Sequence, residues 1–565
     1  MRTRDHESRP AAALGVTYEH GVAFWAGLAS ATVGTVMQLP MYFEARSMHY
    51  RLRGMRVDRT MLLGMVLMVI GVMLTAYGLF PRSRSEEDAP ARSISIHSLD
   101  DARLTRAHLL LIAAMAIAVT IDVMKPTTLA FVASGAAREY GLRSPLNPAS
   151  RGLPIALYPL SGITGTVIGS VTWGWLSDKV GRRASILIAA VMFVCTSTCG
   201  AMPTYTLNLA MCFAMGLGVG GMLPIIFALV SETMPARHRG WIVVLIGGDV
   251  AGAYIIMSWL ASTIGASNRY GWRSLWLVGI PVSLLLVLVN LWIPESPRFL
   301  LQHGRVEEAQ GVIERYGATA VVILDDLDEP ALPESPAYRY ADLTRRPFTG
   351  VTIAIVLLAV GIGVVQYGFQ QWMPSNLQHF GYSEVSANRL LRNSALVGFP
   401  LNFPVAILYG MWSSKKTILG MCGVTALSLV GFAIMGASLG RNRFLVDMLL
   451  IVPIWGISSL TAVAAAYACE LYPTAIRGRG TGLTSGATKV GGVLILAAVA
   501  ARFAAPSVGT SALIGALPVL GGGMLLLYFG VETRTRPLEE IRLTGQLLGR
   551  QLQGVASGGD SAAAG

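Results

Sequence analysis

Long apolar runs without a single charged residue restrict the fold of this chain more than any other feature. Residues 61–80, 275–292 and 351–365 are examples. Each approaches the roughly 20 apolar residues that a helix needs to cross about 30 Å of hydrocarbon. A backbone in that layer has no water to bond, so these runs predict transmembrane helices. The composition agrees, since 53% of the residues are hydrophobic and only 13% are charged, against roughly 25% charged in soluble domains.

Together with apolar runs that carry only a few charged residues, fourteen candidate helices follow one another along the chain. A polar segment, residues 294–347, separates the earlier runs from the later ones. We predict an all-α membrane protein with helices near residues 22–43, 60–80, 107–133, 154–174, 184–202, 206–231, 241–265, 272–293, 349–376, 388–411, 416–438, 444–469, 480–503 and 509–530.

Three loop segments recur at almost equal spacing, which indicates an internal duplication. The pairs are residues 232–240 with 470–478, 174–177 with 410–413, and 295–298 with 532–535. Duplicated helical halves with a substrate site at their interface are a transporter architecture. The predicted organisation is an N-terminal extension with two transmembrane helices (1–106), a six-helix half (107–293), an inter-half loop (294–347), a second six-helix half (348–531) and a tail (532–565).

Charge and cysteine content exclude several functions. The net charge of +12 comes from residues in short segments between apolar runs rather than from a basic stripe, so we expect no nucleic-acid partner. The five cysteines all lie in apolar runs, where they favour helix packing over metal binding. We find no nucleophile and base constellation and expect neither an enzyme, nor a metal site, nor a cofactor.

The loop motifs resemble those of the major facilitator superfamily, in its sugar-porter and organic-ion or aromatic-acid symporter branches. The likeness rests on residues 174–183 (Gly-Trp-Leu-Ser-Asp-Lys-Val-Gly-Arg-Arg), 294–300 (Pro-Glu-Ser-Pro-Arg-Phe-Leu), 232–240, 470–478 and 531–533. It implies the major facilitator fold and alternating-access transport of a sugar or organic acid, with proton symport as one option. It also implies a monomer in the inner membrane, with both core termini cytoplasmic and a small-molecule solute, protons and the lipid bilayer as partners.

By the same resemblance, the charged loop residues form a cytoplasmic gate network that joins the two halves. An ion-pair network that is intact in only one conformation can bias an equilibrium between two states. Charges that merely fix the topology are the alternative. The candidate gate residues are Asp178, Arg182, Arg183, Glu232, Arg239, Glu295, Arg298, Glu470, Arg477 and Glu532.

Ionisable residues at membrane depth are candidates for function. Asp122 and Lys125 lie three residues apart, just before Pro126. Three roles are open for Asp122: proton coupling, a permanent pair with Lys125, and direct contact with the solute. Asp249 is the second proton-coupling candidate, although its small neighbours also allow it to bond an adjacent helix. We expect Lys489 to join the cytoplasmic network.

A polar segment before Pro374 in the second half is the counterpart of the segment around Asp122. Polar groups beside a helix-breaking proline line the sites of many transporters. Aromatic rings there can stack on a sugar or a flat acid, with interfacial anchoring as the alternative. The candidate substrate-binding residues are Lys125, Gln366, Tyr367, Gln370, Gln371, Trp372 and Asn376.

The loop between the first two helices conflicts with the usual charge rule. If both helices span the membrane, residues 44–59 lie outside, yet they carry five arginines against two acids. Cytoplasmic loops normally hold the positive excess. We predict two spanning helices, because the core motifs fix the parity of the remaining helices, and assign this pair no function. A transporter-like solute sensor without net transport is the alternative to a carrier.

Overall fold

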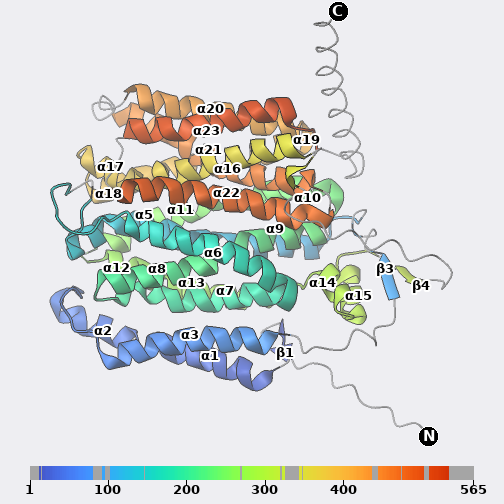
Figure 1. Ribbon diagram of the computed structural model, residues 1–565, viewed down its shortest axis with the longest axis horizontal. Coiled ribbons are helices and arrows are strands. Elements are labelled where there is room, and N and C mark those ends of the chain that lie inside the picture. The colour runs from blue at the N-terminus through green and yellow to red at the C-terminus, as the bar shows by residue number, and fades with distance from the viewer. Residues whose placement is uncertain are drawn as a thin grey trace, which may run out of the picture.

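Helices lying side by side, roughly parallel, make up most of the computed structural model (Figure 1). It describes residues 12–13, 16–18, 20–80, 92–95, 99, 102–144, 147–267, 270–318, 321–324, 343–345, 348–435, 443–472, 474–501 and 508–533.

Two bundles of six helical segments form the core. Several segments are interrupted, so one crossing can comprise two or three labelled helices. The first bundle contains α5 (Arg106–Tyr140), α6 (Leu157–Val180), α7 (Arg182–Thr196) with η3 (Ser197–Ala201), α8 (Tyr205–Val219) with α9 (Met222–Thr233), α10 (Ala236–Gly247) with α11 (Val250–Leu260) and η4 (Ala261–Gly265), and α12 (Trp272–Leu277) with α13 (Gly279–Val289).

The second bundle follows two short surface helices, α14 (Pro297–Gln302) and α15 (Val306–Arg315). It contains α16 (Thr349–Gly368) with η6 (Gln370–Trp372) and α17 (Met373–His379), α18 (Glu384–Gly398) with α19 (Asn402–Met411), α20 (Ser414–Met435), α21 (Arg443–Leu471), α22 (Thr474–Ala500) and α23 (Val508–Phe529).

Thirteen helices in the described part of the chain are long and apolar enough to cross a membrane. The multi-pass all-α fold is therefore confirmed. The run predicted at 154–174 forms α6, which is not among these thirteen. Glycine, serine and threonine are frequent in α6, and it packs closely on α8 and α22. The exact number of fourteen spanning helices stays a prediction.

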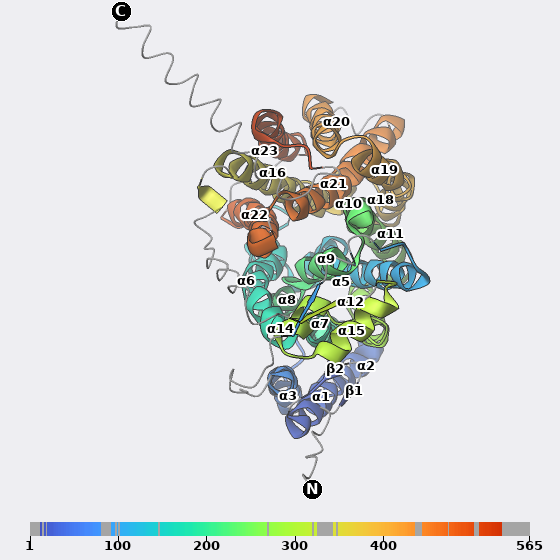
Figure 2. The same cartoon turned by 90° about the vertical axis from the view of Figure 1, so that its right-hand side faces the viewer.

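The first two helices form a separate antiparallel pair, which we call the hairpin: α1 (Gly21–Val36), α2 (Leu39–Glu44), η1 (Ala45–Met48) and α3 (Arg59–Leu79). Small residues bring α1 and α3 close together. A Cβ on Gly27 would lie 2.4 Å from the backbone nitrogen of Thr75. The hairpin packs on α7, on the side of the first bundle that faces away from the second (Figure 2).

Two short antiparallel ribbons lie outside the bundles. One pairs β1 (Ala12–Ala13) with β2 (Val16–Thr17), and the other pairs β3 (Arg92–Ser95) with β4 (Val321–Leu324).

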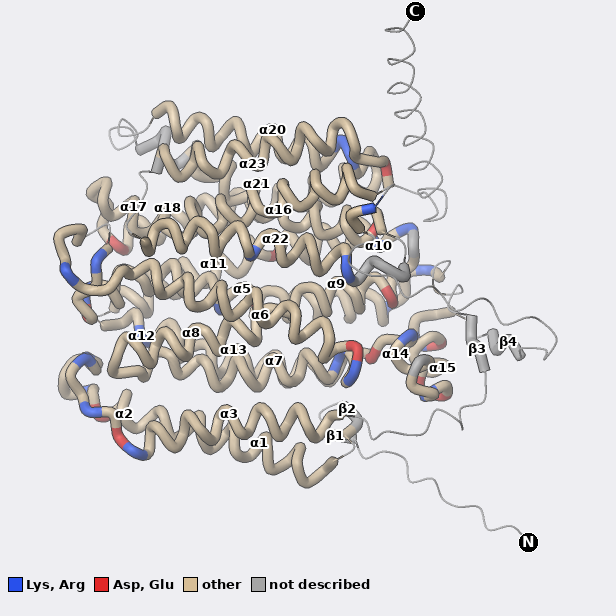
Figure 3. The backbone as a smooth tube through the Cα atoms, viewed as in Figure 1, with Lys and Arg blue, Asp and Glu red and all other residues tan. Residues whose placement is uncertain are grey.

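Charged residues gather mostly at the two ends of the helices, and the middle is largely uncharged (Figure 3). We call the end that carries α14 and α15 the α14 end. The loop that joins α2 to α3 lies at the opposite end. This placement agrees with a pair of helices that both run the length of the bundle.

Candidate functional site

A small cavity lies between the two bundles. About 30 Å³ of it is open to the centre of a water molecule, which is room for about two waters. Residues from α5, α11 and the α16–η6 segment line it: Pro126, Thr127, Ala130, Val250, Tyr254, Gln366, Tyr367, Gln370 and Gln371. Both duplicated halves therefore contribute to one cavity, whose mainly apolar wall carries several amide and hydroxyl groups.

Four of the seven predicted substrate-binding residues line this cavity, namely Gln366, Tyr367, Gln370 and Gln371. Helix α16 ends at Gly368 and a 3₁₀ turn follows, so side chains on both sides of the break reach the cavity. The other three, Lys125, Trp372 and Asn376, are not among the lining residues. Sequence reasoning missed Thr127 and Tyr254, because neither stands out from an apolar helix by charge.

Asp122 is 1% exposed. Neither of its carboxylate oxygens has a hydrogen-bond partner among the described residues. The side chains that lie within electrostatic range of it are Lys489 of α22 and Tyr367 of α16, both from the second bundle. A buried carboxylate without a hydrogen bond is costly. Asp122 lies at the interface between the halves, within electrostatic range of side chains from the other half.

Lys125 points away from Asp122, although the two share a helix. Its Nζ donates a hydrogen bond to the carbonyl oxygen of Phe193 at 2.9 Å and another to the hydroxyl of Ser197. The structure contains no Asp122–Lys125 ion pair, so the permanent-pair interpretation is wrong. The long lysine side chain reaches around α5 to the polar atoms of α7 and η3.

Lys489 lies at the interface of the halves rather than in the α14-end network, so that prediction was wrong. Its Nζ donates a hydrogen bond to the carbonyl oxygen of Gly220 at 2.6 Å, where the crossing formed by α8 and α9 is interrupted. A helix interruption leaves carbonyl groups without an intrahelical donor. A cation from the second bundle therefore caps a broken helix of the first.

A second helix interruption, between α10 and α11, is also bound by side chains of the second bundle. The carbonyl oxygen of Gly248 accepts hydrogen bonds from Asn402 Nδ2 at 3.1 Å and Ser458 Oγ at 3.0 Å, both in the second bundle. The neighbouring carboxylate of Asp249 accepts a hydrogen bond from the hydroxyl of Thr120 within the first bundle. Asp249 thus bonds an adjacent helix, unlike Asp122.

The predicted gate residues of the first half meet at the α14 end. Glu295 accepts hydrogen bonds from the backbone nitrogens of Arg182 at 2.7 Å and Arg183 at 3.2 Å, at the start of α7. Burial raises the pKa of the Glu295 carboxyl, and these N–H donors offset part of that effect. The guanidinium of Arg182 pairs with Asp178 at 2.9 Å and with Glu232 at 3.9 Å.

The second half repeats this arrangement with different donors. Glu532 accepts a hydrogen bond from the backbone nitrogen of Ser414 at the start of α20, at 2.9 Å. Glu470 accepts hydrogen bonds from the hydroxyls of Tyr409 at 2.8 Å and Thr533 at 2.7 Å. The acid that caps a helix start is therefore duplicated, whereas α7 begins with Arg182 and Arg183 and α20 with Ser414 and Lys415.

The two networks approach each other through α10. Arg239 lies within electrostatic range of Glu470, and a Cβ on Gly240 would lie 2.1 Å from a carboxylate oxygen of Glu470. Arg298 makes no ion pair or hydrogen bond with other described residues. The side chain of Arg477 lies outside the described part of the structure.

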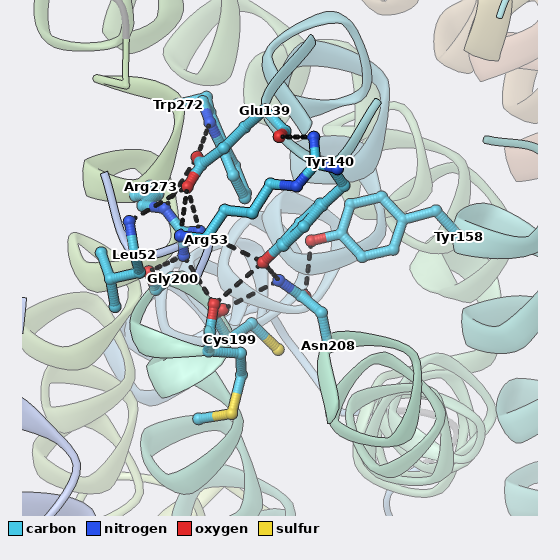
Figure 4. Close-up of polar contacts among 11 residues, drawn as sticks. Leu52, Arg53, Glu139, Tyr140, Tyr158, Cys199, Gly200, Asn208, Trp272 and Arg273 are labelled. Carbon is cyan, nitrogen blue, oxygen red and sulfur yellow. Dashed lines mark hydrogen bonds and ion pairs between the residues drawn. The ribbon is translucent and has the colours of Figure 1, made fainter. Parts of the chain in front are cut away.

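A buried ionic cluster at the opposite end was not predicted. Glu139 and Arg273 form an ion pair at 2.7 Å, with side chains 1% and 0% exposed. Figure 4 shows Trp272 and the backbone nitrogens of Leu52 and Arg53 converging on the same carboxylate. Next to it, Arg138 pairs with Glu384 of the second bundle at 2.5 Å.

The sequence model of the Major Facilitator Superfamily matches residues 107–496, more than half of the chain. This protein is thus a member of the Major Facilitator Superfamily, a multi-pass membrane transporter rather than an enzyme. The hairpin precedes the matched residues.

Similar proteins are named as metabolite transporters. The niacin transporter NiaP of Acinetobacter baylyi is 26% identical over 445 residues, which cover 75% of this chain and 93% of that protein. The major myo-inositol transporter IolT of Bacillus subtilis is 25% identical over 345 residues, covering 57% and 70%.

Among solved structures, the proton:xylose symporter XylE of E. coli bound to 6-bromo-6-deoxy-D-glucose superposes with a TM-score of 0.60 at 18% identity. The match covers 77% of this chain and 98% of that one. It confirms the major facilitator fold.

Proposed function

We propose that this protein is a secondary active transporter that moves a small polar solute across the inner membrane by alternating access, coupled to protons. The observation that carries the proposal is a cavity at the interface of the two halves, lined in part by glutamine and hydroxyl side chains. The buried carboxylate of Asp122 lies close by and has no hydrogen-bond partner among the described residues. Substrate and coupling-ion sites of such carriers lie near the bilayer midplane at the repeat interface.

Contacts between the halves on both sides of the cavity support alternating access. Toward the opposite end, Ser134 lies 3.2 Å from Ser375 between their hydroxyl oxygens, and Arg138 pairs with Glu384. Toward the α14 end, α10 packs on α19 and α21. Opening either side requires breaking only the contacts on that side, which is how rigid-body rocking exposes a central site alternately.

The lining favours an uncharged polar solute. Three glutamine amides and the hydroxyls of Thr127, Tyr254 and Tyr367 offer both donors and acceptors. An anion in this cavity would find no cationic side chain among the lining residues, and Lys125 and Lys489 bond to backbone carbonyls. Hydroxyl-rich solutes such as sugars and polyols fit this chemistry, as the transporters of xylose and myo-inositol among the similar proteins suggest.

Asp122 is the group we assign to proton coupling. It faces Lys489 and Tyr367, whereas Asp249 bonds Thr120. When the halves separate, the distance from Asp122 to Lys489 changes, and with it the electrostatic stabilisation of the charged carboxylate. The α14 end is cytoplasmic in this proposal, so the loop between α2 and α3 faces the outside.

Uptake into proteoliposomes tests the proposal, with a panel of sugars, polyols and organic acids and with or without a pH gradient. We expect Asp122→Asn to abolish accumulation driven by the pH gradient while retaining solute exchange. Asp249→Asn is the matched control and should retain gradient-driven accumulation. Gradient-driven accumulation that survives in Asp122→Asn would refute the assignment of Asp122. Solute binding without accumulation or exchange in the unmodified protein would favour the sensor.

A further inference from the structure

The hairpin lies far from the cavity, yet its loop reaches the helix that lines the cavity. Helices α1 and α3 pack on α7, and the hydroxyl of Tyr42 lies 2.9 Å from that of Ser274 at the start of α12. Further along this loop, Leu52 and Arg53 contact Glu139 in the last turn of α5 (Figure 4). The hairpin is thus fixed to the first bundle at the end of the helices that lies away from α14.

The loop makes three hydrogen bonds to one residue of α5. The backbone nitrogens of Leu52 and Arg53 each donate to Glu139 Oε1 at 3.1 Å. The Arg53 guanidinium donates to the main-chain oxygen of Glu139 at 2.8 Å. The last carbonyl groups of a helix lack an intrahelical donor, and a positive charge there is favourable. Arg53 therefore completes the end of α5.

The same turn of α5 carries an ion pair between the two halves. Arg138 precedes Glu139 and pairs with Glu384 of α18. Neighbouring residues on a helix point about 100° apart. The side chain of Glu139 therefore faces the hairpin loop and the first bundle, whereas that of Arg138 faces the second bundle. The orientation of this one turn decides whether Arg138 meets its partner.

We propose that the hairpin positions the outer gate of the transporter: its loop, through Arg53, holds the last turn of α5 so that Arg138 engages Glu384. The inference rests on the proposed alternating access, because it assigns the Arg138–Glu384 pair to the gate. Arg53 is a positioning residue that touches neither the solute nor the cavity. It explains why a loop rich in arginine lies at the end where the usual charge rule does not expect it.

Glu139 is held at two places, its main-chain oxygen by Arg53 and its carboxylate by Arg273. An effect of Arg53 on the gate can therefore be separated from a loss of protein stability. The carboxylate is also held by Arg273, at 3.0 Å from Nε and 2.7 Å from Nη2. Removing the Arg53 side chain therefore leaves the buried ion pair and the two loop N–H donors in place. What is lost is the contact with the main chain of α5, so its last turn can shift while the cluster stays intact.

Labelling of an introduced cysteine measures the gate without knowledge of the solute. Ala130→Cys places a thiol in the cavity lining, and the five native cysteines are buried. The labelling rate with a membrane-impermeant maleimide is measured in right-side-out and inverted vesicles. We expect Arg53→Ala to increase the rate about fivefold from the outer side only, as for a shift of about 1 kcal/mol. Arg53→Lys, which keeps a cationic donor, should restore much of the original rate.

Three further variants separate the outcomes. Arg56→Ala, at an exposed position of the same loop, is the matched control and should label like the parent. Glu384→Ala breaks the ion pair directly and should also increase labelling, with no further increase when it is combined with Arg53→Ala. If Glu384→Ala labels like the parent, the outer gate itself is wrong. If Glu384→Ala increases labelling and Arg53→Ala does not, the role of the hairpin is refuted while the gate stands.

Discussion

Helix α5 carries two buried carboxylates that differ in their hydrogen bonds. Glu139 receives donors from Arg273, Trp272 and the hairpin loop, whereas neither oxygen of Asp122 has a hydrogen-bond partner among the residues described. A satisfied buried ion pair holds one arrangement of its neighbours. An unsatisfied carboxylate at the interface of the two halves can respond to a change in its surroundings. One helix thus combines a fixed end with a responsive middle.

Arg273→Met should cause the largest loss of stability. It leaves the carboxylate of Glu139 buried without its cation, which costs about 3–5 kcal/mol when one member of such a pair is removed. The measurement is the thermal unfolding midpoint of the purified protein in detergent. Combining Arg273→Met with Glu139→Gln should recover much of the loss, because no charge is then left unpaired and an amide oxygen can still accept the N–H donors. A double variant as unstable as Arg273→Met would contradict this account of the cluster.

Gln370→Ala should weaken solute binding by about tenfold, the effect of losing about one hydrogen bond to the solute. Gln370 lines the cavity, while Asn376 lies on the same polar segment and does not. The apparent affinity for the transported solute is compared with that of Asn376→Ala, which should match the unmodified protein. Equal losses in both variants would place the solute elsewhere along this segment.

Asp122→Asn should change the unfolding midpoint least, by the equivalent of less than about 1 kcal/mol. No described residue makes a hydrogen bond to its carboxylate that could be lost, and the amide is similar in volume. Thermal unfolding of this variant is measured beside that of Glu139→Gln, which removes a charge from a fully bonded carboxylate and should be clearly less stable. A large loss in Asp122→Asn would mean that this carboxylate is structural, and would remove the contrast along α5.

The sequence predicted the helices and four of the nine residues that line the cavity, because both leave strong local signals. Charge-free runs mark the spans, and a cluster of glutamines in an apolar segment marks polar lining. Thr127 and Tyr254 were missed because single hydroxyls occur throughout such helices. The partner of Lys125 could not be predicted, since spacing along α5 places it near Asp122 but does not reveal the carbonyl of Phe193 across the helix interface.

Lys489 and the Glu139–Arg273 cluster depend on tertiary packing alone. The hydrogen bond from Lys489 to Gly220 joins residues 269 positions apart, and that from Arg273 to Glu139 spans 134. Considered alone, Glu139 and Arg273 look like other charges near the end of an apolar run, and the position of Lys489 within its run does not reveal its partner. Only the arrangement of the bundles shows that one lies at the interface of the halves and the others inside the first half.

The bonds between the hairpin loop and Glu139 also have a consequence for biogenesis. Leu52 precedes Glu139 by 87 residues, so the hairpin is synthesised well before the carboxylate that its loop binds. Arg273 is synthesised later still. The small-residue contacts of α1 and α3 allow this pair to associate on its own in the meantime. The cluster of Glu139, Arg273 and the hairpin loop can therefore form only late in membrane insertion. Its formation requires that the helices of the first half that contribute to it are already in place.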